Sequence, residues 1–310
     1  MASRNKRFIY ITLVLVMIAW GLNVIATKLL VTSFSPVTIT AFRIFAASIC
    51  VFIILGAMKK VRIPTKREVK FIIIGGLFNV VAHHFFLSLG LKETTASNGG
   101  LILGLGPLLT TILAIAFLGA TLTMARIVGV LLGFTGVALV VLKNGNVSGV
   151  SIGDLFVFIS ILSQAISFIF ISKIAKTLDP RLMTGYMLLF GSLVLFVISL
   201  VVEPKGLQSL ANGSALVWLV FFASAFIATA VGHMVYNFSV GQIGAAETSI
   251  FINLNPFFAL LGAVIFLHEK IVLSQIFGFC FIIAGVVVGS DLWIEIIRNS
   301  RKNKMKNLSA

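Results

Sequence analysis

Runs of about twenty apolar residues recur along the whole chain, and each run is bounded by proline, glycine, asparagine or charged residues. A helix of that length spans the hydrocarbon core of a bilayer. The pattern therefore predicts an all-α polytopic membrane protein with ten transmembrane helices and short connections. The predicted helices cover residues 8–30, 37–58, 70–91, 96–118, 124–142, 154–176, 183–202, 215–239, 245–267 and 273–294.

The composition agrees with a membrane protein and excludes a soluble domain. Hydrophobic residues make up 59% of the 310 residues and charged residues only 11%, whereas a soluble domain keeps about a quarter of its residues charged. The first 30 residues have a basic start and an apolar stretch, as a signal peptide does. That stretch is longer than about 20 residues and lacks a small-residue cleavage site, so we interpret it as a retained first helix.

The net charge of +15 would suggest a nucleic-acid partner in a soluble protein. Here the basic residues lie in tails and loops, where they set membrane orientation instead, so no nucleic acid is expected. Of the 24 Lys and Arg residues, the ten-helix model places eighteen on the side of the termini, five on the other side and Arg43 within a helix. This asymmetry predicts a multi-pass protein of the cell membrane with both termini in the cytoplasm.

The chain carries an internal repeat at an offset of 149 residues. This offset aligns Pro107 with Pro256 and His84 with His233, and it also brings pairs of glycines into register. We predict two repeats of five helices, residues 1–148 and 149–310. Because five is odd, the second repeat must insert upside down, an arrangement typical of secondary transporters with a substrate site near the bilayer midplane.

Several motifs also resemble a known family. They are "WGLNVIATK" in the first helix, Pro36 followed by "FR" at Arg43, and "AAETSIFINLNPFFALLGAVIFLHEKIVLSQIFGFCFIIAGVVV" in the second repeat. Together they resemble the EamA-type family of the drug/metabolite transporter superfamily. The resemblance implies a ten-helix transporter of the bacterial cytoplasmic membrane, often an exporter of amino acids or other small metabolites. The family commonly has a glutamate after helices 4 and 9; Glu269 matches it, but Ala120 stands at the first position.

Polar side chains inside the predicted helices are the candidate substrate-binding residues, because an unsatisfied polar group in a bilayer is costly. Asn79 and His83 are four residues apart on one helix face, and His233 and Asn237 repeat that spacing. The alternative interpretation of these groups is hydrogen bonding between helices. The predicted cavity residues are Trp20, Asn23, Asn79, His83, Gln164, His233, Tyr236, Asn237 and Asn253.

Two charged residues within or beside the helices are candidates for a charge or proton-coupling role. Arg43 lies about two turns into its helix, where it either extends to the outer surface or attracts an anionic group such as a carboxylate. Glu247 is either a proton-coupling acid or a first-turn acid that favours the helix dipole. A histidine is a further candidate for proton coupling, whereas facilitated diffusion needs no titrating group.

The histidines do not predict a metal site, and no cofactor is expected. His83 and His84 are adjacent, so they project about 100° apart on a helix and are poorly placed to chelate one ion. No carboxylate lies near them in the sequence, and no phosphate-binding loop for ATP occurs.

The prolines of the repeat are predicted as bend points for gating. Pro256 is expected to free the carbonyl near Ile252, and Asn253 and Asn255 are expected to help satisfy or to border that turn. The two amides face about 200° apart, and Asn253 is preferred for the cavity. At the equivalent Pro107, glycines replace both amides.

We therefore predict a secondary transporter of small organic molecules that works by alternating access. A flippase for lipids or lipid-linked sugars on the same fold is the alternative, and an intramembrane enzyme is a weaker one. The enzyme would need a nucleophile or metal motif such as G-x-S-x-G or H-E-x-x-H, and neither occurs within the predicted membrane helices. Solute, direction, coupling ion and oligomeric state stay open.

Overall fold

The computed structural model describes residues 2–94, 102–121, 123–141, 151–267 and 273–289. Within these ranges the chain is helical, with short connections and no strand. The first half contains α1 (Ala2–Ser33), α2 (Pro36–Ala57), α3 (Lys66–Gly76), the π-helix η1 (Leu77–Ala82), α4 (His83–Glu93), α6 (Gly106–Leu118) and α7 (Met124–Val141).

The second half of the chain contains a similar series. Its elements are α8 (Ile152–Ile174), α9 (Pro180–Val202), α10 (Gly206–Ser209), the 3₁₀-helix η3 (Leu210–Asn212), α11 (Ala215–Ala223), the π-helix η4 (Ser224–Gly232), α12 (His233–Ile243), α13 (Ala245–Ser249), the 3₁₀-helix η5 (Ile250–Leu254), α14 (Asn255–Leu267) and α15 (Leu273–Gly289).

These elements confirm the predicted membrane helices. Segments α3-η1-α4, α11-η4-α12 and α13-η5-α14 each form one helical rod, so the described residues contain the ten predicted rods. Six are long and apolar enough to cross a bilayer, and α6, α7 and α15 are shorter apolar helices. The first helix starts earlier than predicted, and parts of the helices predicted at 96–118 and 273–294 lie outside the described residues.

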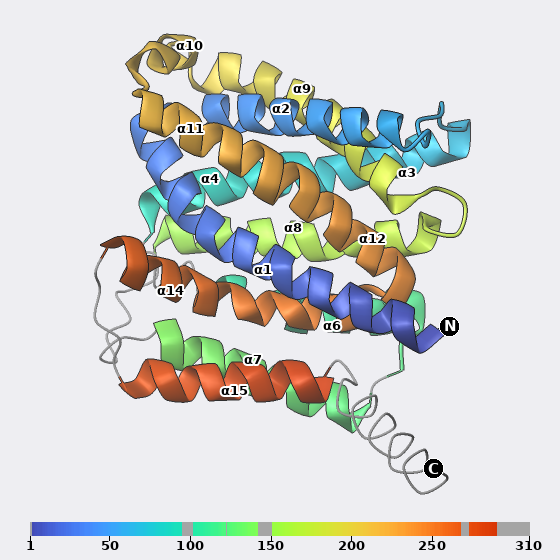
Figure 1. Ribbon diagram of the computed structural model, residues 1–310. Helices are drawn as coiled ribbons and strands as arrows, with labels where there is room; N and C mark the ends of the chain where they lie inside the picture. Colours follow the sequence, from blue (N-terminus) through green and yellow to red (C-terminus); the bar gives the residue numbers. More distant parts are fainter. Residues whose placement is uncertain (1, 95–101, 122, 142–150, 268–272, 290–310) are drawn as a thin grey trace, which may run out of the picture.

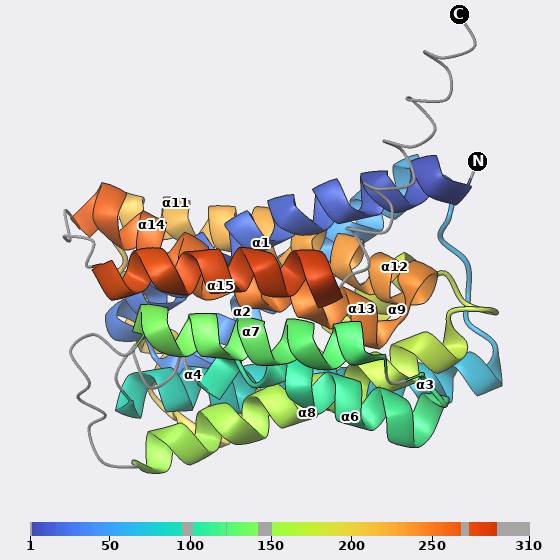
Figure 2. The ribbon, with the colours of Figure 1, turned by 90° about the horizontal axis from the view of Figure 1, so that it is seen from below.

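The rods lie roughly parallel or antiparallel to one another in a bundle (Figure 1). Two pairs join corresponding helices of the two halves. Helix α2 packs along α9, and α7 packs along α15, which lie side by side in both ribbon views (Figures 1 and 2).

Glycines allow the close approach of α7 and α15. A Cβ added to Gly129 would lie 2.4 Å from the Cα of Gly289, and one added to Gly136 would lie 2.5 Å from the carbonyl oxygen of Gly278. Backbone therefore meets backbone here, which is how small residues promote helix association in membranes.

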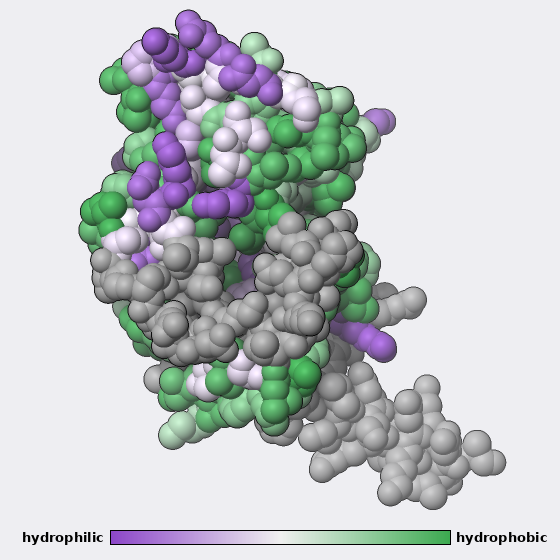
Figure 3. Space-filling model, turned by 90° about the vertical axis from the view of Figure 1, so that its left-hand side faces the viewer, coloured by the Kyte–Doolittle hydropathy of each residue, from purple (hydrophilic) through white to green (hydrophobic). Residues whose placement is uncertain are grey.

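Polar residues gather at the ends of the bundle. Seen from the end that carries α10, hydrophilic side chains occupy part of the end face and hydrophobic side chains cover the flanks (Figure 3). At this end the Glu203 carboxylate accepts the backbone N–H groups of Val37 and Thr38, which caps α2.

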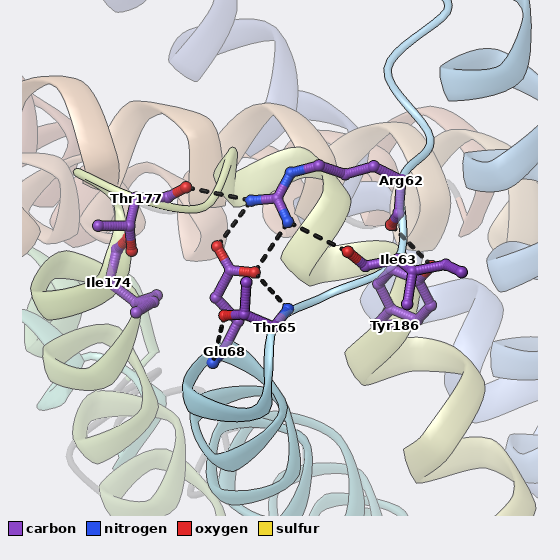
Figure 4. A network of polar contacts seen from close by, with 7 residues as sticks. All are labelled: Arg62, Ile63, Thr65, Glu68, Ile174, Thr177 and Tyr186. Atoms are coloured by element: carbon purple, nitrogen blue, oxygen red, sulfur yellow. Dashed lines mark hydrogen bonds and ion pairs between the residues drawn. The ribbon is translucent and has the colours of Figure 1, made fainter.

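The opposite end holds a compact polar network between α2, α3 and the α8–α9 connection (Figure 4). Glu68 accepts from Arg62 at 2.6 and 2.8 Å and also from the backbone N–H of Thr65. Arg62 donates further to the carbonyl of Thr177, and its own carbonyl accepts from Tyr186. The hydrogen bond to Glu68 raises the pKa of the Arg62 guanidinium. This network ties the two halves of the chain together at this end.

Both prolines that the internal repeat aligns stand at helix starts. Pro107 lies in the first turn of α6, and Pro256 lies in the first turn of α14 after the 3₁₀ segment η5. A missing N–H costs little at that position. The expectation that the carbonyl of Ile252 is free is wrong, because this carbonyl accepts the backbone N–H of Asn255.

Asn253 and Asn255 both border this turn, as expected, but among the described residues no side-chain hydrogen bond of Asn253 satisfies it. Neither side-chain polar atom of Asn253 has a hydrogen-bond partner within the described ranges, and the same holds for Oδ1 of Asn255. Asn253 is fully buried and packs against Gly133 of α7, where an added Cβ would lie 2.1 Å from its Nδ2. Gly133 therefore provides the space for this amide.

Candidate functional site

Two π-helical segments occupy corresponding places in the two halves of the chain. Segment η1 ends directly before His83 and His84, and η4 ends directly before His233. π-helical turns are rare and are frequent at functional sites. They shift backbone hydrogen bonds from the i−4 to the i−5 carbonyl, so they rotate the side chains that follow relative to an α-helix.

The histidines that follow these segments meet inside the bundle. The ring centroids of His84 on α4 and His233 on α12 are 5.6 Å apart, and both side chains are buried. Trp20 of α1 covers His233 with a centroid distance of 4.9 Å. Tyr236 lies 5.0 Å from Trp20 and 4.9 Å from Phe168 of α8. We name these five residues the aromatic cluster; it joins helices from both halves.

His83 faces α8 rather than α12. Its Nδ1 lies 2.8 Å from the hydroxyl and 3.2 Å from the carbonyl of Ser160, and its Nε2 lies 3.1 Å from Nε2 of Gln164. Its ring still contacts His84, with centroids 4.7 Å apart. The structure thus brings the predicted residues His83 and Gln164 together beside the aromatic cluster.

Arg43 lies inside the bundle between α2 and η4. Its side chain is buried, and Nη1 donates to the hydroxyl of Thr229 at 2.6 Å and to the hydroxyl of Ser224 at 3.3 Å. The alternative in which this residue extends to the outer surface is therefore wrong. Ser224 donates in turn to Oδ1 of Asn23 at 2.5 Å, which links α1 to the same network.

The aromatic cluster and the hydrogen-bond network of Arg43 both contact η4. The indole N–H of Trp20 donates to the carbonyl of Ala228 at 2.8 Å, next to the Thr229 that binds Arg43. The aromatic cluster and the Arg43 guanidinium therefore both bond to this turn of η4.

Several buried polar atoms in this region have no protein partner. Nε2 of His84, Nδ1 of His233, the hydroxyl of Tyr236 and Oδ1 of Asn237 have no hydrogen-bond partner in the part of the chain that the structure describes. Such groups are costly unless they bind something in another state of the molecule. The described residues thus leave several hydrogen-bonding groups unused at this place.

Two predicted cavity residues mainly join helices in this structure. Nδ2 of Asn79 donates to Ser167 of α8 at 2.7 Å, and Nδ2 of Asn237 donates to Thr184 of α9 at 2.9 Å. Asn79 and His83 thus share a face toward α8, as their spacing predicted. A role of either amide in solute binding stays a prediction.

Glu247 lies outside this group, in the first turn of α13. Its buried carboxylate accepts from the Tyr10 hydroxyl, and Nζ of Lys6 lies 2.8 Å from its Oε1. The residue therefore joins the first turns of α1 to the second half of the chain. Its proposed proton-coupling role stays a prediction.

His84 and the π-helices are the site features that the spacing of polar residues did not single out. The signal for His84 was its alignment with His233 in the internal repeat. Thr229, which holds Arg43, carried no signal of its own because a threonine in an apolar run is common. No group of three His, Cys, Asp or Glu residues suited to a metal ion occurs among the described residues.

The chain is similar to known proteins along most of its length. The model of the EamA-like transporter family matches residues 7–142 and again residues 151–290. The "Uncharacterized transporter YyaM" of Bacillus subtilis is 32% identical over 297 residues, which is 92% of this chain and 94% of that protein. An "Uncharacterized transporter" of Archaeoglobus fulgidus is 27% identical, over 90% of this chain and 97% of its own length.

A plant protein and a solved structure extend the comparison. The "WAT1-related protein At3g02690, chloroplastic" of Arabidopsis thaliana is 27% identical over 84% of this chain and 64% of that protein. A crystal structure superposes with a TM-score of 0.77 over 93% of this chain and 97% of its own, at 19% identity. The likeness at this identity shows the shared fold.

Proposed function

The chain belongs to the EamA-like transporter family of the drug/metabolite transporter superfamily, and from this membership we propose that it is a secondary transporter that exports amino acids or other small metabolites. The observation that carries this proposal is the aromatic cluster with its unpartnered polar atoms. Its members come from both halves of the chain and meet where α4, α8, α12 and α1 pack together.

The proposed mechanism is alternating access between two inverted repeats, residues 1–148 and 149–310. Support comes from the paired contacts of corresponding helices, α2 with α9 and α7 with α15, and from the corresponding π-helices. In this mechanism Pro107 and Pro256, at the starts of α6 and α14, are the bend points that allow these helices to move, and the cluster opens to one side at a time.

The proposed location is the cell membrane, with both termini in the cytoplasm. Figure 1 places the α1 N-terminus, the α2–α3 connection and the α8–α9 connection at one end of the bundle. The sequence of these segments is rich in basic residues. The Lys and Arg content of short loops is what sets orientation in the membrane.

Transport by this protein is either coupled to protons or is facilitated diffusion. His84, His233 and Glu247 are the candidate groups, because an imidazole or a carboxylate can take up and release a proton. Facilitated diffusion requires none of them, so the dependence of transport on a pH gradient distinguishes the two mechanisms.

The test is solute counterflow in proteoliposomes with a panel of amino acids and metabolites, with and without a pH gradient. We expect at least one panel solute to exchange, and we expect His233→Ala and Asn237→Ala to lower its rate while membrane insertion is retained. Absence of transport of every solute would argue against the proposal. Movement of a fluorescent lipid between leaflets in the same vesicles would favour a flippase instead.

A further inference from the structure

We propose that Arg43 is the anchor for a carboxylate on the transported solute and that the aromatic cluster holds the rest of that solute. This inference deepens the proposed transport function and rests on it. It names the substrate class, a small carboxylate with an apolar or aromatic body, which family membership leaves open.

The first support is the bonding of the guanidinium. Arg43 is 4% exposed, and only its Nη1 is engaged, with the hydroxyls of Thr229 and Ser224. A guanidinium presents five N–H donors in a fork that matches a carboxylate. Nε and Nη2 have no hydrogen-bond partner among the residues that the structure describes. Nε and Nη2 of Arg43 are therefore available to donate two hydrogen bonds to one further partner.

The second support is charge. A buried cation in a membrane helix normally pairs with an anion, because its desolvation is costly. The hydroxyls beside Arg43 have their own protons committed elsewhere: Thr229 donates to the carbonyl of Ser224, and Ser224 donates to Asn23. They offer lone pairs to Arg43 but no negative charge. The positive charge is therefore not neutralised by its neighbours.

The carboxylates of the described residues are placed elsewhere. Five have partners near the ends of the bundle: Glu68 with Arg62, Asp154 with Thr94, Asp179 with Arg181, Glu203 with the α2 N-terminus and Glu247 with Lys6. Glu93 is exposed at the last residue of α4. Within the described ranges Arg43 thus has no carboxylate partner, and a solute is the group that would supply one.

The third support is the position of the aromatic cluster relative to the anchor. Trp20 and Arg43 bond to the adjacent residues Ala228 and Thr229, so both side chains reach the same turn of η4. From Trp20 the cluster continues to His233 and Tyr236, whose Nδ1 and hydroxyl lack partners. A solute bound through its carboxylate at Arg43 would place its body against these rings, where stacking and one or two hydrogen bonds can hold it.

The same arrangement disfavours solutes whose only charge is positive. A cation at this place would meet the uncompensated charge of Arg43 and find no described carboxylate to balance it. The amino group of an amino acid is accommodated only together with its carboxylate. We therefore expect the protein to bind an acid more tightly than the matched amide.

The experiment uses purified full-length protein and pairs of solutes that differ only in the carboxylate: phenylalanine and phenylalaninamide, leucine and leucinamide, phenylacetate and phenylacetamide. Two quantities are measured, the rise in melting temperature in detergent and the inhibition of counterflow in proteoliposomes. We expect at least one acid to stabilise the wild-type protein and to compete with a half-saturating concentration about tenfold or more below that of its amide.

The variants Arg43→Gln and Arg43→Lys test the residue itself. Arg43→Gln should abolish the preference for the acid, and Arg43→Lys should keep part of it, because the charge remains without the fork. Lys28→Gln is the matched control, since Lys28 is another basic residue of a membrane helix but donates to the carbonyl of Leu91 near the end of the bundle. It should leave the preference unchanged.

The outcomes separate this inference from the transport function. Transport by the wild type with equal competition by acids and amides overturns the carboxylate anchor and leaves the transport function standing. The preference of the wild-type protein tests the inference even if Arg43→Gln does not fold. A folded Arg43→Gln variant that keeps the full preference also overturns it. If the wild type neither binds nor transports any panel member, both proposals fail.

Discussion

The imidazole rings of His84 and His233 lie 5.6 Å apart, and each ring follows a π-helical segment in its own half of the chain. The two residues are also aligned by the 149-residue offset of the internal repeat. A residue and its counterpart in the repeat therefore approach each other inside the bundle. Both rings carry a nitrogen without a hydrogen-bond partner among the described residues.

This pairing predicts non-additive effects of substitution. His84→Ala and His233→Ala should each lower the counterflow rate about tenfold or more, and the double variant should lose less than the product of the two losses. The reason is that both rings serve one cluster, and contacting residues couple. The measurement is a double-mutant cycle on counterflow rate. Thr32→Ala is the control, because that exposed hydroxyl bonds only to its own helix. Fully multiplicative losses would contradict a shared role.

The π-helices predict sensitivity to the deletion of a single residue. Removing Phe226 from η4 should restore α-helical hydrogen bonding and rotate Thr229 relative to His233. We expect transport to fall to background while helix content, measured by circular dichroism, stays unchanged. Phe226→Ala is the matched control, since this exposed side chain can be truncated without changing the register. Normal transport in the deletion variant would show that the π-helix is dispensable.

The contact of α7 with α15 predicts a stability defect for larger residues. Gly129→Val should lower the free energy of unfolding by about 1–3 kcal/mol, because its side chain would collide with the backbone of Gly289. Gly56→Ala is the control, since nothing lies within 4 Å of a Cβ at that position. Thermal unfolding in detergent measures both. A melting temperature of Gly129→Val equal to that of the wild type would contradict the close packing.

The start of α9 predicts a stability contribution that depends on pH. Burial raises the pKa of Asp179, but the hydrogen bonds from Arg181 and the charges of Arg181 and Lys60 outweigh it, so the pKa is lowered. A carboxylate with a lowered pKa stabilises the folded state above its unfolded pKa of about 4, and this contribution is lost as pH falls through the folded value.

Asp179→Asn isolates that charge, because asparagine keeps the capping acceptor for the Arg181 N–H. We expect the wild type to be more stable than the variant by about 1 kcal/mol at pH 7, and we expect the difference to vanish in strong acid. Melting temperatures of the two proteins across pH measure it. A difference that is constant with pH would assign the effect to packing.

The pattern of apolar runs was sufficient to predict the helices because a bilayer demands about twenty apolar residues for each crossing. It did not predict the π-helices η1 and η4 or the 3₁₀ segment η5. These change which carbonyl accepts each N–H but leave the hydropathy of the segment as it was. The expectation that Asn253 helps to satisfy the turn at Pro256 failed for a similar reason. The 3₁₀ turn satisfies the backbone locally, and Asn253 turns to Gly133.

The candidate site was predictable where its residues share one helix face. Asn79 and His83 face α8 together, as their four-residue spacing indicates, and Gln164 meets His83 from the facing helix. The partners of Arg43 were not predictable, because Thr229 lies 186 positions away and nothing marks it locally. Only packing of α2 against η4 excludes the alternative in which Arg43 extends to the outer surface.

The sequence by itself determined the class of protein, its ten helices, the asymmetry of basic residues and the alignment of His84 with His233. Each of these follows from hydrophobicity, charge or repetition along the chain, which folding does not alter. The tertiary structure decided which polar groups find partners in other helices and which stay unpaired beside Arg43. Those contacts join residues far apart in the chain, and they depend on helix rotations that hydrophobic patterns leave free.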